Sequence, residues 1–299
     1  MKLNKDRREK RAGKGRGAVF SRFSVVVPVL IVTALLCICV VFLEGGGLRR
    51  KTAVSGSAGG KFVRKTYDGW SASFGIVKII CGDYWGSGVV IACDEDGLVI
   101  VSAKHLLMYD VQAEVIFAGA EREEADSATG QVIGYSASYD LAYLHVSWKD
   151  LTTGVGMRYR GWFEKDRSLP FQEQESESVE NAFEAETVWN DEGQKTVVRT
   201  DRAYMELRAG ENVVQIGMSE SDFLKYRMGT VQAKEVFISD YNAFMLLNEC
   251  LAEAGMSGGG AFDEYERLIG IIIAGDEQGT VCMPMTAVLK EYRDLLKES

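Results

Sequence analysis

The chain is poor in proline, histidine and cysteine, and each shortage excludes a class of protein or limits the candidates for a functional site. Only three prolines occur in 299 residues of which 46% are apolar, which excludes a proline-rich disordered chain and allows a sizeable buried core. The six cysteines show no C-x-x-C spacing, so no metal site is predicted, and nothing indicates another cofactor. The two histidines, His105 and His145, are the only candidates for an imidazole base.

Charge is distributed very unevenly along the chain. Residues 1–22 hold nine Lys or Arg against Asp6 and Glu9, so the rest of the chain carries −16 when these +7 are taken from the overall −9. An acidic main body repels phosphates, so nucleic acid is not expected as a partner.

The segment from Phe23 to Leu43 has 21 residues without a charge. As a helix rising about 1.5 Å per residue it is long enough to cross a hydrocarbon layer of about 30 Å. Because far more basic residues precede this segment than follow it, the sequence predicts a single-pass helix in the cell membrane, with residues 1–22 cytoplasmic and the rest outside. A cleaved signal peptide is the rival interpretation, but no small-x-small cleavage site lies close behind the segment.

The remaining chain falls into four predicted parts. Residues 44–65, rich in Gly, Ser and basic residues, are expected to form a flexible stalk. Short apolar runs about ten residues apart in 66–150 are typical of a β-sandwich or a β-barrel, and similar runs in 195–299 predict a second group of strands that ends in a C-terminal helix. Residues 151–194 form an acidic insertion, interpreted as a solvated loop or as a flap for a basic partner. The fold class predicted from these parts is all-β with a C-terminal helix.

A serine among glycines, Gly255-Met256-Ser257-Gly258-Gly259, precedes the apolar run Leu268 to Gly275. This pattern is typical of a tight turn that exposes a side chain just before a buried strand. A serine hydroxyl becomes a good nucleophile when a base removes its proton and an acid orients that base. His105 lies at the end of the apolar run that begins at Val99, and Asp140 stands at the head of the strand that contains His145. Alternation along that strand predicts a structural or solvent-facing position for His145.

Four segments in this order resemble a trypsin-like serine protease of the HtrA/Deg branch. They are Gly86-Ser-Gly-Val-Val-Ile91, Ser102-Ala-Lys-His105, Tyr139-Asp-Leu-Ala-Tyr-Leu144 and Gly255-Met-Ser-Gly-Gly259. The resemblance implies two six-stranded antiparallel β-barrels, the first in 66–150 and the second in 195–299. It further implies a catalytic triad of His105, Asp140 and Ser257, and an oxyanion hole formed by the backbone N–H groups of Gly255 and Ser257. It also implies a specificity pocket lined by Leu251, Ile272, Ile273 and Ala274, which favours a small or medium apolar substrate side chain. No PDZ domain is expected after the second barrel, and a homotrimer is compatible with the resemblance.

Three positions depart from the family pattern. Met256 stands where Asn or Asp is common, Ala254 where Pro is common, and Lys104 where Ala or Asn is usual. They allow the hypothesis that the turn before Ser257 is inactive at rest and becomes ordered by substrate.

The cysteines outside the apolar segment leave two alternatives open. The resemblance brings Cys250 and Cys282 near the substrate pocket, where they would form a disulfide or stay as buried thiols, and the state of Cys81 and Cys93 is equally open.

Two functions are compatible with these residues. The first is a membrane-anchored serine endopeptidase acting on polypeptides outside the cytoplasmic membrane, in protein quality control or signalling. The alternative is a catalytically silent trypsin-fold protein that binds peptides or a partner.

Overall fold

The computed structural model describes 71–107, 110–117, 126–151, 159–160, 185–190, 192–218, 220 and 224–298. The predicted membrane segment 23–43 and the predicted stalk lie outside these residues. Among the helices in the described ranges, none is both long enough and apolar enough to cross a membrane.

The first six-stranded barrel follows a short 3₁₀ helix, η2 (Ser71–Gly75). Its strands are β1 (Ile76–Cys81), β2 (Tyr84–Cys93), β3 (Gly97–Ser102), β4 (Gln112–Phe117), β5 (Asp126–Tyr135) and β6 (Ala142–Ser147). They are ordered β1-β4-β5-β6-β3-β2, and antiparallel pairing of β2 with β1 closes the barrel. Inward and outward residues alternate along β4, where Ala113, Val115 and Phe117 are buried, as expected for a strand with one face on a core.

A hairpin of β7 (Ala185–Trp189) and β8 (Lys195–Arg199) extends the sheet of the first barrel. β8 pairs with Ala92 and Cys93 at the end of β2, just after the register of β2 against β3 shifts. The position of this hairpin differs from the sequence prediction in two ways. β8 belongs to the sheet of the first barrel and not to the second barrel, and β7 is a strand within the acidic segment that the sequence predicts to be a loop. The pairing of β8 with β2 requires a free edge at the end of β2, and the local sequence of either strand does not indicate that edge.

The second barrel is also closed and six-stranded, in the order β10-β11-β14-β13-β12-β9. The short helix α4 (Arg202–Glu206) leads into it, and η4 (Ser239–Tyr241) joins β10 to β11. Its strands are β9 (Asn212–Met218), β10 (Leu224–Ile238), β11 (Ala243–Asn248), β12 (Gly260–Phe262), β13 (Leu268–Asp276) and β14 (Gly279–Pro284). Two closed six-stranded barrels and a C-terminal helix confirm the predicted fold for the described residues.

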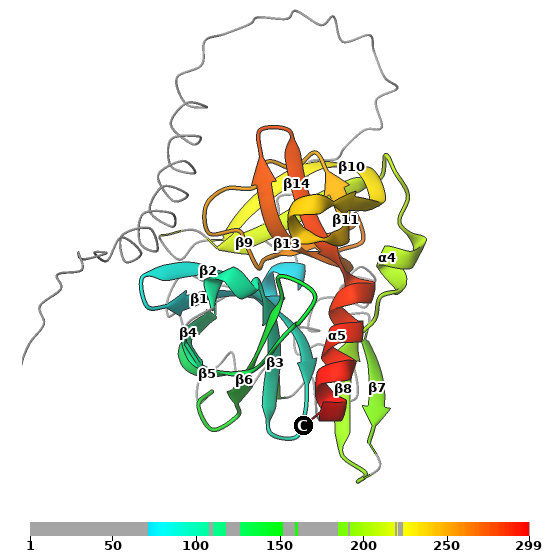
Figure 1. Ribbon diagram of the computed structural model, residues 1–299. Coiled ribbons are helices and arrows are strands. Elements are labelled where there is room, and N and C mark those ends of the chain that lie inside the picture. The colour runs from blue at the N-terminus through cyan, green and yellow to red at the C-terminus, as the bar shows by residue number, and fades with distance from the viewer. Residues whose placement is uncertain are drawn as a thin grey trace, which may run out of the picture. The chain divides into compact units, whose positions relative to one another are not determined.

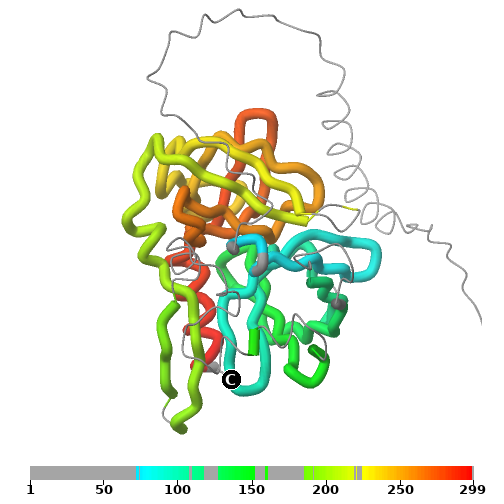
Figure 2. The backbone as a smooth tube through the Cα atoms, turned by 180° about the vertical axis from the view of Figure 1, so that it is seen from behind, coloured from blue at the N-terminus to red at the C-terminus, as the bar shows by residue number. Residues whose placement is uncertain are grey.

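The C-terminal helix α5 (Met285–Glu298) leaves the second barrel and runs beside the first barrel and the β7–β8 hairpin, as both views show (Figures 1 and 2). Val288, Leu289 and Tyr292 form its buried face. On the first barrel, the Tyr143 hydroxyl donates to the Val288 carbonyl at 2.7 Å, and its ring stacks on Tyr292 with centroids 5.9 Å apart. The helix therefore fastens one barrel to the other.

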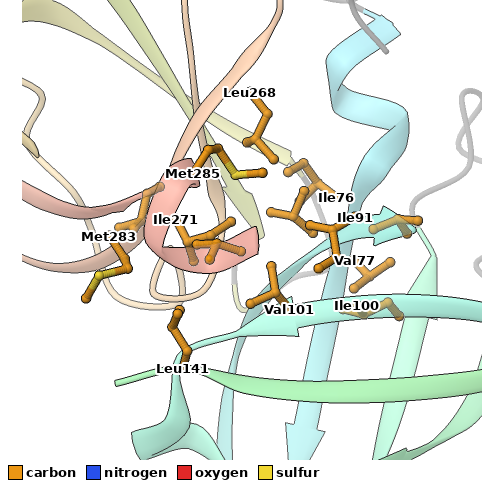
Figure 3. Packing of buried hydrophobic residues seen from close by; sticks show 14 of the residues in the cluster. Ile76, Val77, Ile91, Ile100, Val101, Leu141, Leu268, Ile271, Met283 and Met285 are labelled. Atoms are coloured by element: carbon orange, nitrogen blue, oxygen red, sulfur yellow. The ribbon is translucent and has the colours of Figure 1, made fainter. Parts of the chain in front are cut away.

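Buried apolar side chains of both barrels form one continuous cluster. Figure 3 shows Ile76, Val77 and Val101 of the first barrel near Leu268 and Ile271 of β13. A shared core means that the barrels are held together by burial of apolar surface as well as by hydrogen bonds.

Replacing Tyr292 by Ala tests how strongly α5 fastens the barrels. Tyr292 is 2% exposed, so its loss leaves a cavity against Tyr143, and we expect the free energy of unfolding to fall by about 3–5 kcal/mol. Denaturant unfolding measures this. Lys290→Ala, at a side chain that is 68% exposed, is the matched control and should change stability by less than about 0.5 kcal/mol. Equal effects of the two variants would contradict the role given to α5.

Candidate active site

His105 lies in η3 (Lys104–Leu106), the short 3₁₀ helix after β3, and both its backbone and its ring bond to Asp140. Its ring Nδ1 is 2.6 Å from Asp140 Oδ2, and its backbone N–H donates to Asp140 Oδ1 at 2.9 Å. With both carboxylate oxygens engaged, the carboxylate fixes the ring with Nδ1 as the donor. Among the described residues, no group bonds to Nε2 of His105.

Lys104 also joins η3 to the segment 136–140. This gives a structural role to a residue that departs from the family pattern. Its backbone N–H donates to the Asp140 carbonyl at 3.2 Å, and its Nζ donates to the Ser136 carbonyl at 2.9 Å. η3 is therefore bound to both ends of the segment that carries Asp140. The sequence alone did not indicate this structural role of Lys104.

Two overlapping β-turns, 253–256 and 256–259, lie before β12 and together form the serine turn, with Ser257 at the second position of the second turn. Met256 N–H donates to Glu253 O at 3.0 Å and closes the first turn, and Gly259 N–H donates to Met256 O at 2.9 Å and closes the second. Gly255 and Gly258 occupy the third position of these turns, with φ of +86° and +82°. Positive φ at that position is the signature of a type II turn, which glycine adopts at least cost.

The first turn leaves two backbone donors next to the serine. Within the described part of the chain, the N–H groups of Gly255 and Ser257 donate to no acceptor. Ala254 occupies the second position of this turn, where proline is common, so the hydrogen bond and Gly255 define its shape without proline. Met256 is fully buried beneath it.

The Ser257 hydroxyl donates to the Ile273 carbonyl at 3.2 Å. Ile273 lies at a register shift in β13, where Ile272 pairs with Cys282 and Ala274 pairs with Val281, so Ile273 has no partner in β14. Across the described residues, no hydrogen bond joins Ser257 to His105.

Gly86 brings the two halves of the site together. A Cβ at Gly86 would lie 2.3 Å from Leu106 Cδ1, next to His105, and 3.0 Å from the carbonyl oxygen of Ser257. η3 of the first barrel and the serine turn of the second barrel are thus packed around the same glycine of β2.

The residues assigned to the specificity pocket are only partly brought together. Ile272 exchanges backbone hydrogen bonds with Gly258 and Gly259, so this part of β13 borders the serine turn. Ile272 and Ile273 are buried, Ala274 is half-buried, and Leu251 is 51% exposed rather than enclosed. The pocket stays a prediction.

The four described cysteines are buried free thiols, so no disulfide joins Cys250 to Cys282. Burial raises the pKa of the Cys250 thiol to about 12 and also raises that of Cys282. Both therefore stay protonated near neutral pH and behave as small apolar residues.

His145 pairs with an acid far from the serine turn. Its Nε2 lies 3.4 Å from Asp94 Oδ1, and this hydrogen bond raises the pKa of His145 against the opposing effect of burial. Burial raises the pKa of Asp94, but the hydrogen bond and charge of His145, with backbone N–H groups, bring it below its ordinary value. This geometry gives His145 a structural position, as expected from the sequence.

Two six-stranded barrels, with a His–Asp pair on one and a glycine-flanked serine on the other, define a two-barrel trypsin-like fold. The family model of the trypsin-like peptidase domain matches residues 86–271, more than half of the chain. The chain belongs to this family.

Solved structures of HtrA-type proteases have a similar fold. HtrA-type protease AlgW with a tripeptide is 15% identical, with a TM-score of 0.52, over 76% of this chain and 61% of AlgW. AlgW with a decapeptide is 14% identical, with a TM-score of 0.50, over 75% and 65%. Deg5 is 19% identical, with a TM-score of 0.47, over 73% and 87%. No curated protein matches the chain.

The His145–Asp94 pair should make stability depend on pH. Because the folded pKa of His145 is raised and that of Asp94 is lowered, the full contribution lies between about pH 4 and 6.5 and is lost as pH rises through the folded pKa of His145. We expect wild type to exceed Asp94→Asn in unfolding free energy by about 0.5–1 kcal/mol more at pH 5.5 than at pH 8.5. Denaturant unfolding at both pH values measures this. A difference between the two proteins that does not depend on pH would contradict the pairing.

Proposed function

We propose that this protein is a serine endopeptidase in which Ser257 attacks the peptide carbonyl, His105 transfers the proton and Asp140 orients the imidazole. The observation that carries the proposal is the 2.6 Å contact between His105 Nδ1 and Asp140 Oδ2, beside a serine turn that packs on the same glycine of β2. This arrangement supports acyl transfer because it provides an oriented base within a polar, partly exposed site.

The proposed reaction begins with rotation of the Ser257 hydroxyl away from the Ile273 carbonyl toward His105 Nε2. The serine oxygen then bonds to the substrate carbonyl carbon, and its proton passes to Nε2. The oxyanion accepts hydrogen bonds from the N–H groups of Gly255 and Ser257, which bond to nothing else among the described residues. His105 returns the proton to the leaving amine, and water attacks the acyl-enzyme by the same steps in reverse.

The charge of His105 changes in each half of this cycle. Asp140 stabilises the imidazolium because it holds the Nδ1–H and carries a negative charge. The ring is 42% exposed while the carboxylate is 16% exposed, so the base is open to substrate and its partner is shielded.

The proposal extends to the location and substrates of the enzyme. Residues 23–43 would anchor it in the cell membrane as a single-pass helix, with the N-terminus cytoplasmic and the peptidase outside. Polypeptides would be its substrates, in quality control or signalling, and a homotrimer is compatible with this arrangement. The competing function is a silent trypsin-fold protein that binds a partner without turnover.

A fluorophosphonate probe separates the enzyme from the silent alternative. We expect wild type to be labelled at Ser257 and Ser257→Ala to remain unlabelled, because the probe reports an activated serine. Gel fluorescence after labelling of purified protein and of whole cells measures reactivity and sidedness together. Ser147→Ala, at the end of β6 opposite to Asp140, is the control and should be labelled like wild type. An unlabelled wild type that is folded would support the silent protein.

Cleavage specificity gives a second test of the proposed pocket. Because no carboxylate stands at Leu251 and the neighbouring wall is Ile272 to Ala274, we expect cleavage after Val, Ala or Leu. Mass spectrometry of a peptide library after digestion identifies the residue before each cut. Ser257→Ala digests serve as blanks, and cleavage chiefly after Arg or Lys would contradict the pocket.

A further inference from the structure

Ser87 is a fully buried serine of β2 whose hydroxyl connects three separate parts of the chain. Its Oγ donates to the Gly255 carbonyl at 2.6 Å and accepts the backbone N–H of Met218, at the end of β9, at 2.7 Å. One hydroxyl therefore joins the first barrel, the second barrel and the turn before Ser257. A buried hydroxyl used as both donor and acceptor has little freedom to reorient.

The backbone of Ser87 holds the other side of the same turn. Its N–H donates to the Ser257 carbonyl at 2.8 Å, and its own carbonyl accepts the Ser102 hydroxyl at 2.7 Å. Ser87 thus holds the carbonyl of Gly255 and the carbonyl of Ser257, one on each side of Met256. The carbonyl of Gly255 shares a planar peptide group with the N–H of Met256, and the carbonyl of Ser257 shares one with the N–H of Gly258. Fixing these two groups restricts the adjoining peptide groups, which carry the N–H of Gly255 and the N–H of Ser257.

The residues held in this way are the two whose N–H groups the proposed mechanism assigns to the oxyanion. We propose that Ser87 is a positioning residue that holds the oxyanion hole in its reactive shape, an inference that rests on the proposed peptidase function. Ser87 contacts none of the reacting atoms and no side chain of the triad, because its bond to Ser257 is to the backbone carbonyl. It acts through Gly255 and Ser257.

The expected loss of rate follows from the two hydrogen bonds that the Ser87 hydroxyl makes. Removing one oxyanion donor typically costs about 100- to 1,000-fold in rate, and misplacing one by about 1 Å can cost about 100-fold. Without the Ser87 hydroxyl, Gly255 O and Met218 N each lose their partner. The first turn then keeps its backbone hydrogen bond from Met256 N–H to Glu253 O but loses the one that fixes the Gly255 carbonyl, so the peptide group of that carbonyl can reorient.

The test compares Ser87→Ala with Ser102→Ala, using a fluorophosphonate whose phosphoryl oxygen occupies the oxyanion hole. The serine oxygen bonds to phosphorus, fluoride leaves and His105 takes the proton, so labelling requires the same donors as peptide cleavage. We expect the maximal labelling rate of Ser87→Ala to fall about 10- to 100-fold, while the concentration for half-maximal rate changes less than about threefold.

Ser102→Ala is the matched control because it removes a buried hydroxyl from the same barrel that bonds to Ser87 O and not to Gly255. We expect its maximal labelling rate to stay within about threefold of wild type. Thermal unfolding of each variant gives the loss of stability separately, and a merely structural role predicts rate losses that follow stability in both variants.

Two further variants keep the inference testable if Ser87→Ala does not fold. Ser87→Thr retains the hydroxyl and should recover most of the labelling rate, whereas Ser87→Cys offers a weak S–H donor and should label about as slowly as expected for Ser87→Ala. The inference is overturned if the folded Ala or Cys variant is labelled as fast as Ser102→Ala, or if a folded Thr variant is as slow as Cys. A wild type that is not labelled refutes the peptidase function instead.

Discussion

The candidate site depends on how closely β2 of the first barrel approaches the serine turn of the second. A Cβ at Gly258 would lie 2.0 Å from the carbonyl oxygen of Ser87, so the approach requires glycine. The glycines around Ser257 therefore do more than allow positive φ, because they also let the turn lie against the neighbouring barrel. Since the histidine and the serine come from different barrels, a small change in this contact would move the two groups relative to each other.

Most strand segments and the candidate triad residues could be predicted from local sequence. A serine between glycines and a histidine after a buried strand are local signals, and their chemistry requires an acid, so Asp140 completed a small set. The structure pairs His105 with Asp140, while the catalytic roles of the three residues stay a prediction. The order of the segments along the chain supported the resemblance from which two barrels were predicted.

Contacts between distant segments were not accessible from the sequence. β8 belongs to the sheet of the first barrel because β2 presents an edge beyond its register shift, and the sequence of β8 says nothing about that edge. Ser87 looked like one residue of a Gly-Ser-Gly motif, because its role depends on which carbonyl lies opposite its hydroxyl. Lys104 looked like a departure, although its side chain binds the segment that carries Asp140.

The resting position of the Ser257 hydroxyl follows from the geometry of β13. The register shift leaves Ile273 without a partner in β14, and its carbonyl is the acceptor for Ser257. The serine is therefore held on its own barrel while His105 is held by Asp140 on the other. Rotation about the Cα–Cβ bond of Ser257 redirects the hydroxyl without moving the backbone, so the turn and the proposed oxyanion donors keep their places. A group that reorients by one torsion within a fixed frame needs little reorganisation, which is the condition under which preorganised donors stabilise a developing charge best.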